Sequence, residues 1–126
     1  MKILSIIDIP NKYNLFIECS KKKPTGDCFE SAGKYIIDNG RNGDLILVHG
    51  LAIGRGPIAG IKFSHAWIEQ GDLVIDVANG RHIELPKNIY YALGNISETF
   101  KYTFEDVLKK TLDTGHWGPW DLISEY

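Results

Sequence analysis

The sequence predicts an α+β domain in which helices pack on a mostly antiparallel sheet. An amphipathic helix is expected from about residue 27 to residue 38, and a run of short apolar strands follows it. Two further helical segments come after most of these strands. One helix, then several strands, then short helices is an order typical of an α+β fold, because it lacks the regular alternation of a parallel α/β sheet.

The first expected helix carries the clearest signals. Its apolar positions recur at helical spacing, and Thr25 or Asp27 can cap its start. Asn39 and Gly40 are typical of a helix end. Short strands are expected before it at residues 2–8 and 13–19, separated by Pro10-Asn11. The apolar face of the helix is formed by Phe29, Ala32, Gly33, Ile36 and Ile37.

The remaining elements follow from apolar alternation and turn residues. Residues 50–60 contain four glycines and one proline, which predicts a mobile loop or a long hairpin tip. Thr103 is placed to cap the last helix, which Gly115 ends. Further strands are expected at 44–49, 62–69, 73–77, 81–85 and 98–102, and helices at 87–93 and 104–113.

Composition limits the classes of function. A chain of 126 residues fits one domain, spanning residues 1–126, and its net charge of −2 gives no case for nucleic-acid or membrane-surface binding. No stretch approaches the roughly 18 apolar residues of a membrane span, so we expect a cytoplasmic protein. The four histidines are scattered and the two cysteines do not form a Cys-x-x-Cys pair. We therefore expect neither a metal nor another cofactor.

Cys28 is the candidate nucleophile, because it falls in the first turn of the expected helix. The free N–H groups and the dipole of a helix start favour a thiolate, which lowers a cysteine pKa. We expect the sulfur to be exposed at the edge of the preceding loop. Cys19 ends an apolar run and is expected to be buried and inert. The alternative for Cys28 is a small buried apolar residue of the helix.

His65 and Asp76 are the candidate partners of this cysteine. Alternation in strand 62–69 places His65 and Trp67 on one face, with Phe63 and Glu69. Asp76 is an acid within an apolar strand, and a buried carboxylate there needs a partner. The alternatives are a histidine satisfied by a local hydrogen bond and an aspartate that caps a turn.

The turn between these two strands decides how His65 and Asp76 meet. If Gln70-Gly71 are the turn residues, His65 lies directly opposite Asp76. If Gly71-Asp72 form the turn, the two side chains are diagonal and still share a face. A three-residue turn would place them on opposite faces. In the first two cases the carboxylate can reach the imidazole.

The three residues together predict nucleophilic catalysis. Cys28 attacks an acyl carbon, His65 moves the proton, and Asp76 orients the imidazole and stabilises its charged form. The backbone N–H of Cys28 is expected to donate a hydrogen bond to the oxyanion that forms in the reaction. A second donor is not identified, and Asn11, Tyr13 and Asn14 are possible.

The motifs Gly26-Asp27-Cys28-Phe29, His65-Ala66-Trp67-Ile68-Glu69 and Val74-Ile75-Asp76 resemble the papain-like cysteine hydrolase superfamily. They are closest in order to its transglutaminase-like and bacterial cell-wall endopeptidase branches. The resemblance covers residues from about 25 to 80. It implies a papain-like core, in which a cysteine-bearing helix packs on an antiparallel sheet, and a peptide, protein or other amide-containing substrate.

Other side chains are candidates for substrate binding. Trp67 lies on the His65 face, and Arg55 could bind a substrate carboxylate in bidentate fashion. Asn79 follows the Asp76 strand and could line the same cleft, together with His82 and Glu84. The aromatic segment 116–120 is expected to seal an edge of the core.

Two other functions remain open from the sequence. One is a non-catalytic binding module that keeps the same fold, in which the three residues are structural. The other is a metal-dependent enzyme that uses His65, Asp76 and His82 to hold an ion and its water. The reactivity of Cys28 distinguishes the first from an enzyme, and sensitivity to chelators would indicate the second.

Overall fold

The computed structural model describes residues 27–54 and 59–122. The strands expected at residues 2–8 and 13–19 lie outside this part. The described elements are α2 (Asp27–Asn39), β1 (Ile46–Ile53), β2 (Lys62–Gln70), β3 (Leu73–Asp76), the 3-10 helix η2 (Ala78–Gly80), β4 (Ile83–Pro86), α3 (Lys87–Gly94), β5 (Ser97–Tyr102) and α4 (Phe104–Thr114). Within the described residues, the expected α+β class is confirmed, with three α-helices and one five-stranded sheet.

The sheet has the strand order β4-β3-β2-β1-β5, and every neighbouring pair is antiparallel. The turn between β2 and β3 contains Gly71 and Asp72, because Gln70 pairs with Leu73. Gly71 has a φ of 59°, a left-handed conformation that glycine adopts without strain. Of the hairpin registers open from the sequence, the structure therefore has the one in which His65 and Asp76 are diagonal on a shared face.

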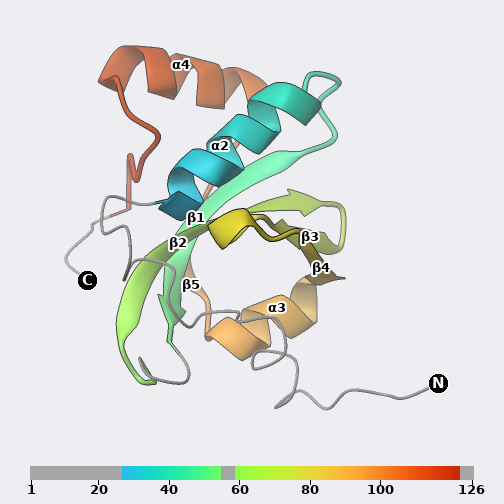
Figure 1. Ribbon diagram of the computed structural model, residues 1–126, viewed down its shortest axis with the longest axis vertical. Coiled ribbons are helices and arrows are strands. Elements are labelled where there is room, and N and C mark those ends of the chain that lie inside the picture. Colours follow the sequence, from blue (N-terminus) through green and yellow to red (C-terminus); the bar gives the residue numbers. More distant parts are fainter. Residues whose placement is uncertain (1–26, 55–58, 123–126) are drawn as a thin grey trace.

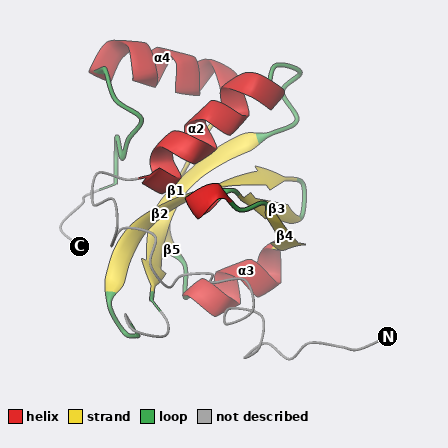
Figure 2. Ribbon diagram, viewed as in Figure 1, coloured by secondary structure: helices red, strands yellow, loops and turns green. Residues whose placement is uncertain are grey.

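Helices cover both faces of the sheet (Figure 1). α2 and α4 lie together on one face, where Phe29 of α2 contacts the ring of His49 in β1. α3 covers the other face, where Tyr90 contacts Trp67 of β2. The secondary-structure colouring in Figure 2 shows the same arrangement, with the strands between the two helical layers. Both faces of the sheet are therefore covered, which explains why nearly all residues of β1 and β2 are buried.

α2 forms where the sequence predicts it and buries the expected face. Phe29, Ala32 and Ile36 are at most 3% exposed. Gly33 lets the ring of Trp117 approach closely, since a Cβ at this position would lie 2.5 Å from the ring. The helix ends at Asn39, and the Gly40 N–H then bonds the Ile36 carbonyl. The helix is therefore fixed on the sheet from its first turn to its last.

β1 is longer than the sequence predicts. Residues 50–53 continue the strand and pair with β2, so of the mobile loop and the long hairpin that the sequence left open, the structure has the long hairpin. Leu51 and Ala52 are buried, so each face of this extension contributes to the core. Gly50 fits here because a Cβ would lie only 2.8 Å from the Trp67 ring. The glycine that suggested a loop thus allows close packing inside a strand.

The C-terminal part of the described chain closes one edge of the core, as expected. Thr103 and Asp106 form a capping box at the start of α4, and Gly115 ends the helix in a left-handed conformation. Trp117 and Trp120 then pack against the core. None of the described helices combines the length and the apolar character needed to cross a membrane.

Candidate active site

His65 and Asp76 form the centre of the candidate site. Nε2 of His65 lies 3.0 Å from Oδ2 of Asp76, and each residue is 1% exposed. Ile68 of β2 pairs with Ile75 of β3. Continuing this register places Asp76 opposite Trp67, and His65 is the next residue of β2 on the same face as Trp67. Long side chains reach each other across such a diagonal. The structure thus confirms the expected contact between this histidine and this aspartate.

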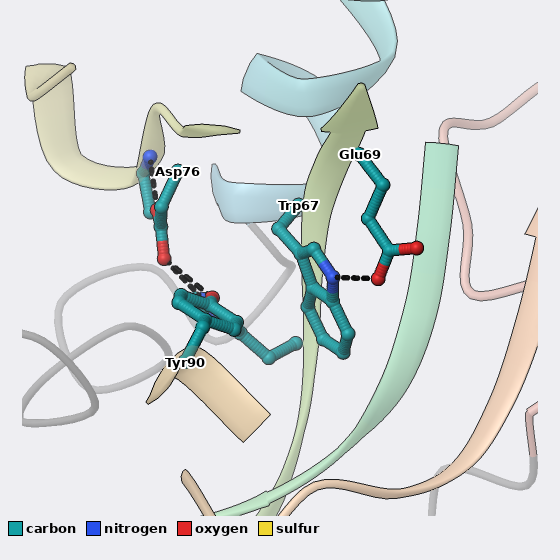
Figure 3. A network of polar contacts seen from close by, with 6 residues as sticks. Trp67, Glu69, Asp76 and Tyr90 are labelled. Carbon is teal, nitrogen blue, oxygen red and sulfur yellow. Dashed lines mark hydrogen bonds and ion pairs between the residues drawn. The ribbon is translucent and has the colours of Figure 1, made fainter. Parts of the chain in front are cut away.

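Asp76 accepts hydrogen bonds on both carboxylate oxygens. Oδ2 accepts the hydroxyl of Tyr90 at 2.6 Å (Figure 3). The same oxygen contacts His65, and Oδ1 accepts the backbone N–H of Ala78 at 2.9 Å. Burial alone would raise the pKa of Asp76. His65, Tyr90 and the Ala78 N–H outweigh burial, and the pKa of Asp76 is lowered. The carboxylate is therefore ionised although it is buried.

Cys28 belongs to α2, and its side chain interacts with the imidazole of His65. β3 pairs only with the last three residues of β2, so no strand of the described chain flanks His65 on that side. The chain leaves β3 through η2, which contacts α2. Cys28 lies in the first turn of α2, as expected, but it is only 2% exposed. The expectation of an exposed sulfur is wrong, because this position faces the core together with Phe29 and Ala32.

The charge state of His65 reflects both partners. Burial would lower its pKa, but the Asp76 carboxylate opposes this, and so does a hydrogen bond and charge interaction with the Cys28 side chain. The combined effect raises the pKa of His65 to about 10. Since Nε2 faces Asp76, Nδ1 is the ring nitrogen left for the thiol. The imidazole can therefore take the Cys28 proton while Asp76 stabilises the resulting charge.

Aromatic side chains surround His65 on its own strand. Phe63 meets the imidazole edge to face at 5.8 Å, and Trp67 stacks with it at 6.0 Å. The Trp67 indole donates to Glu69 at 3.0 Å (Figure 3), and Tyr91 donates to the same carboxylate. Trp67, a candidate for substrate binding, is 0% exposed. Its place in the structure is that of a packing partner of His65, without a surface open to a ligand.

The other candidate residues lie apart from this centre or outside the described residues. Arg55 is outside them. Asn79 belongs to η2, but its side chain is not among those described. His82 is exposed and bonds Glu84 at 2.8 Å, so it does not join His65 and Asp76. Within residues 27–54 and 59–122, no three His, Cys, Asp or Glu side chains are grouped so that they could hold a metal ion.

Sequence reasoning missed Tyr90, whose hydroxyl contacts Asp76 directly. It lies in α3 and is separated from Asp76 by 14 positions, so no local motif connects them. The available signal was a tyrosine in a helix expected to pack on the sheet, because a buried tyrosine hydroxyl requires a partner. The oxyanion candidates Asn11, Tyr13 and Asn14 lie outside the described residues.

A separate cavity of about 610 Å³ lies between α3 and the β5 side of the sheet. It does not include Cys28, His65 or Asp76, and we therefore treat it as distinct from the candidate site. Its lining residues are Asp72, Pro86, Lys87, Asn88, Tyr91, Thr99 and Lys101. Lys87 and Lys101 both lie near Glu69, at 3.4 and 3.5 Å, and balance its charge.

Comparison with known proteins gives no match. No protein-family model, no curated protein and no solved structure is similar enough to assign this chain. The evidence for function is therefore the site itself, in which one buried histidine interacts with both a carboxylate and a thiol.

Proposed function

We propose that this protein is a cysteine hydrolase or acyltransferase that acts on an amide, peptide or isopeptide bond through Cys28, His65 and Asp76. The observation that carries the proposal is the position of His65, which contacts Asp76 through Nε2 and interacts with the Cys28 side chain. A thiol, an imidazole and a carboxylate in this order are the groups that nucleophilic acyl transfer requires.

The reaction follows from these contacts. His65 takes the thiol proton, and the Cys28 sulfur attacks the acyl carbon while Asp76 stabilises the imidazolium. His65 then gives its proton to the leaving amine, the carbon–nitrogen bond breaks, and a thioester remains. Water or an acceptor amine attacks the thioester carbon and loses a proton to His65. The carbon–sulfur bond then breaks, and His65 gives the proton to the released Cys28 sulfur. The backbone N–H of Cys28, in the first turn of α2, is the donor that we propose for the oxyanion.

The arrangement of elements supports a papain-like core as part of the proposal. A cysteine in the first turn of a helix packed on an antiparallel sheet, followed by His and Asp on adjacent strands, is the order that the resemblance implies. Because Cys28 is 2% exposed, the proposal also requires that the surroundings of the sulfur open to admit a substrate.

Alkylation by iodoacetamide tests the proposal. The rate is measured against pH in the wild type, Cys28→Ser and His65→Ala, and mass spectrometry locates the label on Cys28 or Cys19. We expect Cys28 to react well below pH 8.5, the usual thiol pKa, and to react about a hundredfold more slowly at pH 6 in His65→Ala. His82→Ala is the matched control, since His82 also bonds a carboxylate but at the surface.

The outcomes separate the two functions that involve this fold. A low-pH reaction that needs His65 and not His82 supports the enzyme and directs a substrate screen toward amides, isopeptides and glutamine side chains. A Cys28 that reacts like an ordinary thiol in all variants contradicts the enzyme. The protein would then be studied as a non-catalytic binding module, with the three residues as part of its core.

A further inference from the structure

Tyr90 contacts the same carboxylate oxygen that His65 contacts. Its hydroxyl lies 2.6 Å from Oδ2 of Asp76, and the residue is 0% exposed. Tyr90 comes from α3, which covers the face of the sheet opposite α2. Asp76 is thus held by His65 from β2, by the Ala78 N–H from its own strand end, and by Tyr90 from a helix on the other side.

We propose that Tyr90 is a positioning residue of this site, which fixes the Asp76 carboxylate in the charged form and in the orientation that His65 requires. The inference deepens the proposed function and rests on it. Tyr90 acts through Asp76, and its hydroxyl is a hydrogen-bond donor to the carboxylate, with no role in proton transfer to the substrate.

The hydroxyl is not explained by packing alone. The ring of Tyr90 packs against Trp67 at 5.3 Å, and a phenylalanine would keep this contact. Burying a hydroxyl is unfavourable unless it finds a partner, and Asp76, the carboxylate that contacts His65, is such a partner. A donor to a carboxylate favours its ionised form, so the bond opposes the burial that would otherwise protonate Asp76.

The adjacent residue provides a matched control. Tyr91 also donates its hydroxyl to a buried carboxylate, at 2.5 Å, but that carboxylate is Glu69. Tyr90→Phe and Tyr91→Phe therefore each remove one hydroxyl from the same helix and leave one buried carboxylate with one donor fewer. They differ in whether the carboxylate contacts His65, which is the difference that the proposal needs.

The experiment measures the rate of Cys28 alkylation by iodoacetamide from pH 4 to pH 9 in the full chain. The acid limb of this profile is the low-pH part, where the rate rises with pH. In Tyr90→Phe we expect the acid limb to shift to higher pH by about half to one unit, because Asp76 binds a proton more readily. At a pH on this limb the rate falls about threefold to tenfold. In Tyr91→Phe we expect the wild-type profile.

The outcomes keep this inference apart from the proposed function. If wild-type Cys28 reacts only as an ordinary thiol, both fail. If the wild type reacts at low pH and the two variants have the same profile, only the role of Tyr90 fails. A chain with 3-fluorotyrosine at position 90 keeps the shape and donates more strongly, so its acid limb should move to lower pH. An unchanged limb there overturns the inference even if Tyr90→Phe does not fold.

Discussion

His65 and His49 lie on neighbouring strands and are both buried, at 1% and 0% exposed, yet their environments differ in kind. His65 is paired with Asp76, and its pKa is raised to about 10. His49 is enclosed by aromatic rings, and within the described part of the chain neither ring nitrogen has a hydrogen-bond partner. Burial lowers the pKa of His49 to about 3. The rings around it are Phe29, Tyr102 and Trp120, at 4.8 to 5.0 Å.

This difference teaches that burial does not decide the charge of a histidine by itself. Burial disfavours the imidazolium at both positions, and the outcome depends on whether a charged partner is held in contact. Asp76 contacts His65 directly, whereas the charge of Asp121 does not outweigh the effect of burial on His49, and Asp121 is itself bonded to Tyr102. The chemistry is therefore expected at His65, and His49 serves to pack the C-terminal segment.

Asp76→Asn should make the environment of His65 more like that of His49. The amide keeps the size of the side chain and removes its charge, so burial then lowers the pKa of His65. We expect Cys28 alkylation at pH 6 to slow by about tenfold to a thousandfold, in line with the pKa change of about 1–3 that a close carboxylate typically causes. Alkylation kinetics and the pH titration of the His65 ring by NMR measure the two effects.

Asp121→Asn is the control for this comparison, because Asp121 is the carboxylate that acts on His49. It should leave the alkylation profile of Cys28 unchanged. If both variants slowed the reaction equally, the effect would come from lost stability, and the special role of Asp76 would be contradicted.

For the described residues, the sequence was sufficient to predict the order of the α-helices and strands and the contact between His65 and Asp76. Both depend on local patterns, namely strand alternation and a short turn that limits the pairing register. The choice between the two allowed registers required the structure, since Gln70-Gly71 and Gly71-Asp72 are both reasonable turns. The extent of β1 was missed because Gly50 signals a loop locally, and only its contact with Trp67 explains it.

The environments of Cys28 and Asp76 could not be read from local patterns. The depth of Cys28 depends on how α2 meets η2 and β2, which are distant in sequence. The contact of Tyr90 with Asp76 depends on where α3 crosses the sheet. In each case the deciding neighbour is supplied by tertiary packing, to which propensity and periodicity are insensitive.

Gly118→Ala tests how closely the aromatic surroundings of His49 are packed. Gly118 has a φ of 116°, and a Cβ there would lie 2.6 Å from Cε1 of His49. We expect the substitution to lower the unfolding free energy by about 2–3 kcal/mol, through overpacking of a buried ring and backbone strain. Urea unfolding at pH 7 measures the loss.

Gly115→Ala is the comparison for that measurement. Gly115 also has a positive φ, of 76°, but a Cβ there has no neighbour within 4 Å. Gly115→Ala should lower the unfolding free energy by roughly 1 kcal/mol, through backbone strain alone. Equal losses in the two variants would mean that the ring of His49 moves aside easily, which contradicts a closely packed environment.

His49→Phe should remove a pH dependence that His65 cannot cause. The pKa of His49 is about 3 in the folded chain and 6.5 as the ordinary value, so the unfolded chain binds the extra proton between these limits. The stability that neutral His49 provides is complete above pH 6.5 and is lost as the pH falls toward 3. His65 has a raised pKa, so its contribution is complete below 6.5 and is lost as the pH rises toward 10.

The size of the effect follows from the same linkage. Each pH unit below 6.5 costs the wild type about 1.4 kcal/mol through His49, which amounts to roughly 2 kcal/mol at pH 5. Phenylalanine keeps the ring contacts and cannot bind the proton. Between pH 7 and pH 5, the free energy of unfolding of the variant should therefore fall by about 2 kcal/mol less than that of the wild type. Urea unfolding at both pH values measures the difference, with His82→Phe as an exposed control. A stability difference between His49→Phe and the wild type that stays constant over this range would show that His49 does not resist protonation, and the contrast between the two buried histidines would not hold.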